Sequence, residues 1–154
     1  MGKAIINNHA EFEEYLGKVI GESDYHQITQ EQINKFADAT LDYQWIHIDE
    51  EKAKTGPFGT TIAHGYLTLS LIPYLWDQIT EFHNVKMLVN YGMDKLKFGQ
   101  AVKVDSEIKL TATLKNIANL RGITKAEVEA LLEIKGEKKP AFTATVIFLY
   151  HFEQ

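Results

Sequence analysis

The chain has 154 residues, of which 45% are hydrophobic, and its formal net charge is −5. This size and apolar content suit one compact domain with its own core, so we treat residues 1–154 as a single unit. The absence of cysteine excludes disulfides, thiolate metal sites and cysteine nucleophiles, and suits a reducing compartment such as the cytoplasm. A negative net charge without a Lys/Arg-rich block argues against nucleic acid as a partner.

A membrane location is not expected either. The longest mainly apolar run, residues 66–76, is too short for a bilayer span, which needs about 20 apolar residues. Residues 1–14 contain no apolar stretch of signal-peptide length. We therefore expect a protein of the cytoplasm that does not associate with a membrane.

The first forty residues predict two helices separated by a short strand. Residues 9–16 favour a short helix and residues 25–28 a short strand. Thr29 and Gln32 form a capping-box pattern, and the apolar side chains that follow recur at helical spacing. We expect an amphipathic helix that delivers the chain to Asp42.

Two further helices are expected before the middle of the chain. Asp49 is suited to cap a short helix through Lys54, because its carboxylate can accept from first-turn N–H groups. The stretch from Ala63 to Trp76 is apolar nearly all round, which predicts a helix enclosed by other structure. Pro73 should kink or restart that helix, because proline has no N–H to donate to the preceding turn.

After residue 84 the hydrophobic pattern changes to period two, which predicts β-strands. Residues 124–134 could instead form a helix, but the turn at 136–140 and the alternation after it favour a strand. A buried helix followed by long antiparallel strands implies an α+β fold, in which a curved sheet wraps around that helix. The strands are expected at residues 85–91, 102–114, 127–134 and 141–152, separated by Gly92, Gly99, Gly122 and Gly136.

One segment carries residue types that suit acid-base chemistry. Asp42 and His47 lie five positions apart in an expected loop after a helix, where a turn could aim both at one small molecule. Water addition to an activated alkene needs one group that takes a proton from water and one that gives a proton to the α-carbon. Asp42 could instead be a helix C-terminal turn residue, and His47, next to apolar neighbours, a satisfied core residue.

The residues at the start of the expected buried helix suggest a site for a carbonyl oxygen. Gly65 stands where helix N–H groups lack partners and the dipole is positive, and it has no Cβ to obstruct a ligand. A donor there could stabilise an enolate oxygen, although glycine could equally serve close packing. For His64 a supporting hydrogen bond is favoured over catalysis. Ser70 could bind substrate or bond back to a helix carbonyl.

Other chemistries have weaker support. His47, Asp49 and His64 are all zinc-ligand types, but no compact metal motif such as His-Glu-x-x-His is present. The sequence also lacks Gly-x-Gly-x-x-Gly, a P-loop and Gly-x-Ser-x-Gly. Neither a nucleotide cofactor nor a serine nucleophile is therefore expected.

Two linked motifs carry a family pattern. The first is Phe36-Ala-x-x-Thr40-x-Asp42-x-Gln44-x-x-His47-x-Asp49, and the second is Gly56-Pro-Phe-Gly59-Thr-Thr-Ile-Ala-His64-Gly65. Together they resemble the MaoC-like dehydratases, also called R-specific enoyl-CoA hydratases. Residues 44–47 and 62–73 look closest to the nodulation-protein-N-like branch.

The resemblance implies a hotdog fold, usually a homodimer, and syn hydration of a trans-2-enoyl-CoA to an (R)-3-hydroxyacyl-CoA without a metal or redox cofactor. It implies Asp42 and His47 as the acid-base pair around one water, and Gly65 as the oxyanion N–H. Ser70 matches a serine near the family site. The partner is then an acyl-CoA thioester, with an acyl-carrier-protein thioester as the alternative.

At one position the chain departs from the family. The family has Asn-Pro where this chain has Gln44 and Trp45, and a glutamine amide can still hydrogen-bond water or the catalytic pair. A non-catalytic acyl-thioester binding or signalling protein and a hotdog thioesterase are the alternative functions.

Overall fold

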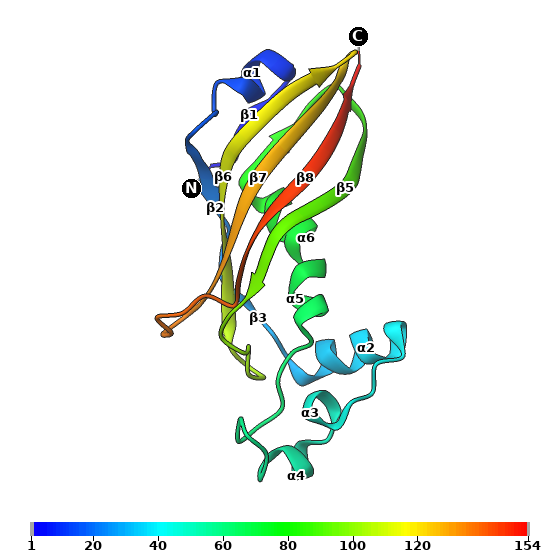
Figure 1. The fold of residues 1–154 in the computed structure, drawn as a ribbon, viewed down its shortest axis with the longest axis vertical. Helices are drawn as coiled ribbons and strands as arrows, with labels where there is room; N and C mark the ends of the chain where they lie inside the picture. Colours follow the sequence, from blue (N-terminus) through cyan, green and yellow to red (C-terminus); the bar gives the residue numbers. More distant parts are fainter. Residues whose placement is uncertain (1, 154) are drawn as a thin grey trace.

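The computed structural model describes residues 2–153, with short elements in the N-terminal half and four long strands in the C-terminal half (Figure 1). In chain order the elements are β1 (Ala4–Ile6), α1 (His9–Glu13), β2 (Val19–Glu22), β3 (His26–Gln27), α2 (Gln30–Thr40), α3 (Trp45–Ile48), α4 (Glu50–Ala53), α5 (Gly65–Ser70), α6 (Ile72–Ile79), β4 (Thr80–Phe82), β5 (Val85–Phe98), β6 (Glu107–Leu120), β7 (Ile123–Ile134) and β8 (Phe142–Phe152).

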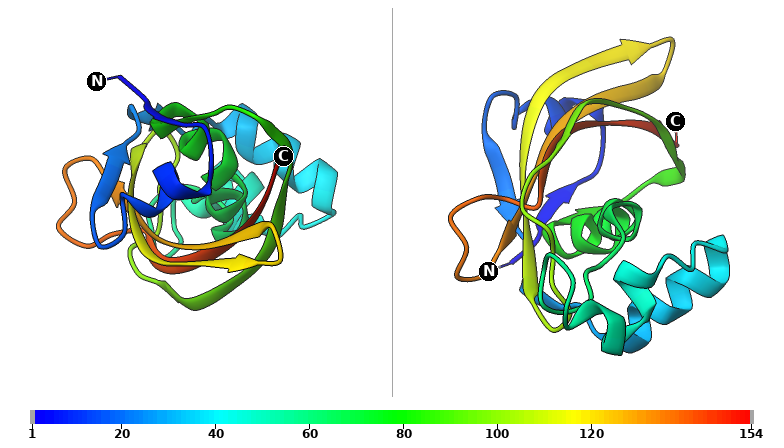
Figure 2. Two further views of the ribbon diagram at one scale, coloured as in Figure 1. Left: turned by 90° about the horizontal axis from the view of Figure 1, so that it is seen from above. Right: turned by 60° about the horizontal axis from the view of Figure 1, so that its bottom comes forward.

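The main sheet is antiparallel and curves around the α5–α6 segment. Its strand order is β2-β6-β7-β8-β5, with β3 also pairing with β6, so β5 forms one edge. The views in Figure 2 show the long strands wrapping around the green helical segment. The predicted α+β fold, with a sheet wrapped around a central helix, is therefore confirmed.

The core lies between α6 and the concave face of the sheet. Every second side chain of β7 and β8 is buried, as expected for a sheet with one covered face. Trp76 from α6 stacks on Phe148, and its indole N–H donates to the Tyr150 hydroxyl at 2.6 Å. Tyr150 is 1% exposed, and this burial raises the pKa of its phenol strongly.

Within the described residues, no helix is long and apolar enough to cross a membrane.

The caps expected at Thr29 and Asp49 are confirmed. Thr29 caps α2 by accepting from the Gln32 N–H, and Asp49 caps α4 by accepting from the Lys52 N–H. The predicted long helix is divided into α5 and α6 at Leu71. It restarts there because Pro73 falls in the first turn of α6, where its missing N–H is tolerated.

Several expectations about element limits and burial are wrong. Gly92 lies within β5 at a register shift, and the strand continues to Phe98 instead of ending near residue 91. Residues 102–106 are a loop, since β6 begins only at Glu107. The central helix is not enclosed, because Tyr66 and Tyr74 are 70% and 54% exposed.

The short strands β1, β2 and β4 were not predicted, and neither was the single helical turn α3. Each of these elements has four residues or fewer, too few for a hydrophobic period to show. The turn α3 matters for function, because it carries His47. α2, α3 and α4 lie together beyond one end of the sheet, close to the start of α5 (Figure 1).

Candidate active site

A cavity of about 640 Å³ opens where α5 begins, between the α2–α4 region and the end of β5. Its wall is more apolar than polar, and a few polar groups converge within it, as is typical of small-molecule sites. The lining comes from residues 62–66 and 98–102, together with Asp42, His47, Phe58, Thr68 and Ala141.

Asp42 enters this cavity because α2 ends abruptly. Leu41, the C-cap residue, has the left-handed φ of 66°, which turns the chain out of the helix, and its N–H bonds to the Ala37 carbonyl. The Asp42 side chain is exposed, and one of its oxygens accepts from the Gln44 N–H at 3.3 Å. Its carboxylate is therefore accessible to a small molecule.

His47 projects from α3 and is only 7% exposed. Its Nδ1 lies 2.8 Å from the Ile62 carbonyl oxygen. Since a carbonyl only accepts, Nδ1 carries the proton and Nε2 keeps a free lone pair. Burial lowers the pKa of His47, and His64 adds to this; the Ile62 carbonyl and Asp42 oppose it. At neutral pH His47 is thus an uncharged imidazole able to accept a proton.

His64 lies against His47 and also contacts the Asp42 backbone. The two imidazole rings are stacked, with centroids 3.9 Å apart and an interplanar angle of 23°. His64 Nε2 donates to the Asp42 carbonyl oxygen at 3.1 Å, while Nδ1 is buried without a partner in the described part of the chain. His64 thus connects the loop that carries Asp42 to the start of α5.

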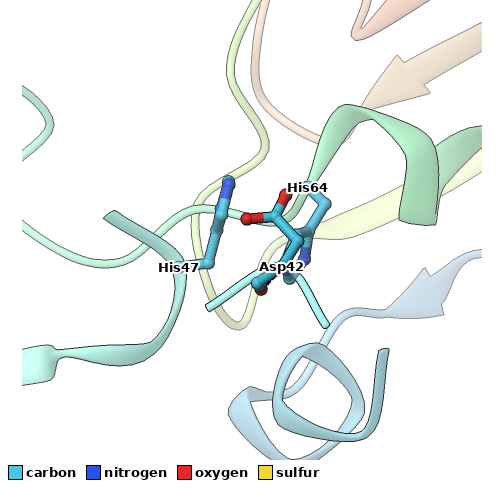
Figure 3. Close-up of side chains that lie close together, drawn as sticks. All are labelled: Asp42, His47 and His64. Carbon is cyan, nitrogen blue, oxygen red and sulfur yellow. Dashed lines mark hydrogen bonds between the residues drawn. The ribbon is translucent and has the colours of Figure 1, made fainter. Parts of the chain in front are cut away.

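Asp42, His47 and His64 form the only group of three potential metal ligands in residues 2–153, with ligand atoms within 4.8 Å of one another (Figure 3). Each histidine already uses one nitrogen on a backbone carbonyl. The in-plane lone pairs of two nearly parallel rings run side by side and do not converge on one ion. Asp49, which the sequence offered as a third zinc ligand beside His47 and His64, caps α4 instead. The arrangement suits proton transfer better than tetrahedral zinc binding.

Gly65 is the first residue of α5 and lines the same cavity. In the described residues, neither its N–H nor that of Tyr66 donates to an acceptor within the chain. A Cβ built on Gly65 would lie 2.9 Å from two ring carbons of Phe98. The absence of a side chain therefore keeps Phe98 close and leaves two N–H donors open at the positive end of the helix.

A carboxylate, a neutral imidazole and free N–H donors around one cavity match the motifs seen in the sequence, and residues 11–135 match the family model described as MaoC like domain. The chain belongs to the MaoC-like dehydratase family.

Relatives of this MaoC-like protein include a dehydratase and a nodulation protein. 3-hydroxyacyl-thioester dehydratase Z of Mycobacterium tuberculosis is 46% identical over 135 residues, or 87% of this chain and 89% of the relative. Nodulation protein N of Rhizobium leguminosarum is 36% identical over 142 residues, or 90% and 88%. R-hydratase PhaJ1 from Pseudomonas aeruginosa has a similar structure, with a TM-score of 0.74 at 20% identity, covering 96% of this chain and 86% of that one. The predicted hotdog fold is confirmed, and so is the assignment to a hydro-lyase family.

Two residues proposed for the site lie away from its centre. Gln44 is exposed at the N-cap of α3, and its side chain does not line the MaoC-like cavity. Ser70 donates to the Tyr66 carbonyl at 2.7 Å, the back-bonding alternative considered from sequence. It lines a second cavity of about 460 Å³ between the helices and β5.

The cavity at the start of α5 is also lined by aromatic residues that were not predicted from the sequence. Phe58 belongs to the second motif, so its position in Gly56-Pro-Phe-Gly59 could have indicated it. No local signal marks Phe98: it reaches Gly65 because β5 pairs with β8 in a register that sets Phe98 opposite Phe142. The apolar wall beside the helix start therefore depends on long-range strand pairing.

Proposed function

We propose that this protein is an R-specific enoyl-CoA hydratase, equally a 3-hydroxyacyl-CoA dehydratase, which reversibly adds water to a trans-2-enoyl-CoA. The observation that carries the proposal is the neutral His47, whose Nε2 lone pair is free beside the Asp42 carboxylate in the cavity that Gly65 lines. These groups supply the proton acceptor and the oxyanion donor that hydration requires.

The proposed reaction begins with the thioester carbonyl accepting a hydrogen bond from the Gly65 N–H. This interaction draws electron density from the double bond and makes C3 electrophilic. Water attacks C3 while His47 Nε2 takes its proton, and the negative charge develops on the thioester oxygen. The Asp42–His47 pair then returns a proton to C2, so both residues end the cycle in their starting protonation states. Since the two side chains lie together, hydroxyl and proton reach the same face of the substrate, which gives syn addition.

The assay is hydration of crotonyl-CoA and longer trans-2-enoyl-CoA substrates, followed by loss of the enoyl thioester absorbance. Asp42→Asn and His47→Ala are expected to remove most activity, while the matched control Asp49→Asn should retain it, because Asp49 caps α4 outside the cavity. A wild type that is inactive at every chain length would refute the proposal. Release of free CoA would indicate a thioesterase, and tight acyl-CoA binding without turnover a binding protein.

We further infer that the protein functions as a homodimer formed through β5. This edge strand has 14 residues and is almost entirely exposed. A long edge strand with unpaired backbone groups and several exposed apolar side chains is a strong candidate for association. Sedimentation should give a dimer that Tyr91→Glu dissociates and that Leu120→Glu, at an exposed position on β6, leaves intact. The large apolar side chains exposed on β5 are Met87, Leu88, Tyr91, Met93, Leu96 and Phe98.

A further inference from the structure

The backbone carbonyl of His47 has an unusual hydrogen-bond partner. α3 has only four residues, so its last carbonyl groups have no partner within the helix. The His47 oxygen accepts from the side-chain amide of Gln30, Nε2 to O at 2.8 Å, across 17 residues of sequence. Among residues 2–153 no backbone N–H outside α3 reaches this oxygen. The amide therefore satisfies the end of the helical turn that carries His47.

The Gln30 amide is itself held in one orientation. Its second N–H donates to Asn34 Oδ1 at 2.9 Å, and its oxygen accepts from Thr61 Oγ1 at 2.5 Å. Turning the amide over would bring its oxygen against the His47 oxygen and Asn34 Oδ1, so only the observed orientation satisfies all its partners. Thr61 is 0% exposed, so its hydroxyl is shielded from competing water.

The same segment that holds Gln30 also holds the His47 ring. Next to Thr61, the Ile62 carbonyl accepts from His47 Nδ1, and the Ile62 N–H donates to the Ile46 carbonyl at 3.0 Å. The ring of His47 is bound to this segment directly, and its backbone is bound through Gln30. The two connections fix both the position of α3 and the direction in which Nε2 points.

We propose that Gln30 and Thr61 are positioning residues for His47 that fix its Nδ1–H tautomer and aim Nε2 into the cavity. The inference rests on the proposed role of His47 as proton acceptor. Loss of the Gln30 amide leaves the His47 carbonyl without a partner and frees α3 to shift, which weakens the bond to Ile62. Because displacement of a catalytic group by about 1 Å can cost on the order of 100-fold in rate, kcat falls about 10- to 100-fold. KM stays unchanged, since neither side chain lines the cavity.

Four variants test this inference by steady-state kinetics on the full chain. Gln30→Met keeps the length of the side chain and removes all three hydrogen bonds, and Thr61→Val keeps the shape and removes the hydroxyl. Both are expected to lower kcat about 10- to 100-fold at constant KM. Thr61→Ser, which retains the hydroxyl, should recover most of the wild-type rate. The control Gln27→Met removes a nearby exposed amide, whose contact to the Asp105 carbonyl is 3.4 Å, and should leave kcat unchanged.

A second measurement does not require turnover. Proton–nitrogen NMR of the ¹⁵N-labelled imidazoles, with the His47 signal identified by its loss in His47→Ala, should show a single Nδ1–H tautomer in the wild type. Gln30→Met and Thr61→Val should show mixed tautomers, and Gln27→Met the wild-type signal. An inactive wild type with these NMR results would refute the hydratase and leave the positioning role standing. If the His47 tautomer is unchanged in Gln30→Met and Thr61→Val, the positioning role is refuted. This holds whether kcat is also unchanged or falls only in proportion to the folded fraction measured by circular dichroism.

Discussion

Gly65→Ala tests whether the start of α5 binds the thioester oxygen. The new Cβ would lie 2.9 Å from Cε1 and Cζ of Phe98, whereas carbon atoms pack comfortably at about 3.5 Å or more, so the ring must retreat by about 0.6 Å. The close contact is with the far end of the Phe98 side chain, at the last position of β5, so rotation of the ring can relieve it without movement of the backbone. We therefore expect a folded protein with little change in stability.

The effect on the reaction should be much larger. A methyl group and a displaced ring beside the Gly65 N–H shift the thioester carbonyl, and loss of one oxyanion donor commonly costs about 10²–10³ in kcat. We expect kcat for enoyl-CoA hydration to fall about 100-fold in Gly65→Ala, with the thermal transition within a few degrees of wild type. Gly92→Ala is the matched control, because its Cβ meets only Ile147 Cδ1 at an ordinary 3.7 Å. Wild-type kcat in Gly65→Ala would refute the oxyanion role. Recovery on adding Phe98→Ala would identify the ring as the cause of the loss.

Three other outcomes are expected. Because burial lowers the pKa of His47 below its usual 6.5, kcat/KM should stay level as pH falls through 6.5 and decline only below it; an acidic limb centred above 6.5 would contradict this assignment. The same shift means that His47 contributes stability above pH 6.5, which urea titrations should show being lost as pH falls through its lowered pKa. His64→Phe keeps an aromatic ring stacked on His47 but removes a group that lowers the pKa of His47, so the acidic limb of the kcat/KM profile should move to higher pH. An acidic limb that does not move argues against this effect of His64 on His47. Trp76→Phe leaves the buried Tyr150 hydroxyl without its donor and should cost about 1–3 kcal/mol in chemical denaturation, part of which Trp76→Phe with Tyr150→Phe should recover.

Local patterns were enough to predict most of the architecture. Three predicted features depend only on residues close to them in the sequence: the cap at Thr29, the apolar run around Pro73 and the alternation before Phe152. They therefore appear in the sequence at the positions where the structure has them. The strand chosen for residues 124–134 was also correct, because β7 is buried at alternate positions between β6 and β8.

Features that depend on long-range contacts could not be predicted. Phe98 reaches Gly65 only through the β5–β8 register, and Gln30 meets Thr61 across 31 residues. Short elements such as α3 have no period to read. Several statements remain predictions: the cytoplasmic location, the single-domain organisation, the absence of a cofactor, and the roles given to Asp42, His47, Gly65, His64, Gln44 and Ser70.

The break in the central helix at Leu71 leaves α5 and α6 in different structural roles. α6 is anchored in the core through the Trp76–Tyr150 bond, whereas α5 is a six-residue segment whose first N–H groups face the cavity. Pro73 provides no N–H to couple the two through the usual i to i−4 bond. Leu67 still holds α5 to the core, because it is 4% exposed and packs in the same cluster as the side chains of α6. Substitutions that reshape the cavity for acyl groups of different size would therefore be tolerated best at exposed positions of α5 such as Tyr66, which lines the cavity and lies outside the core.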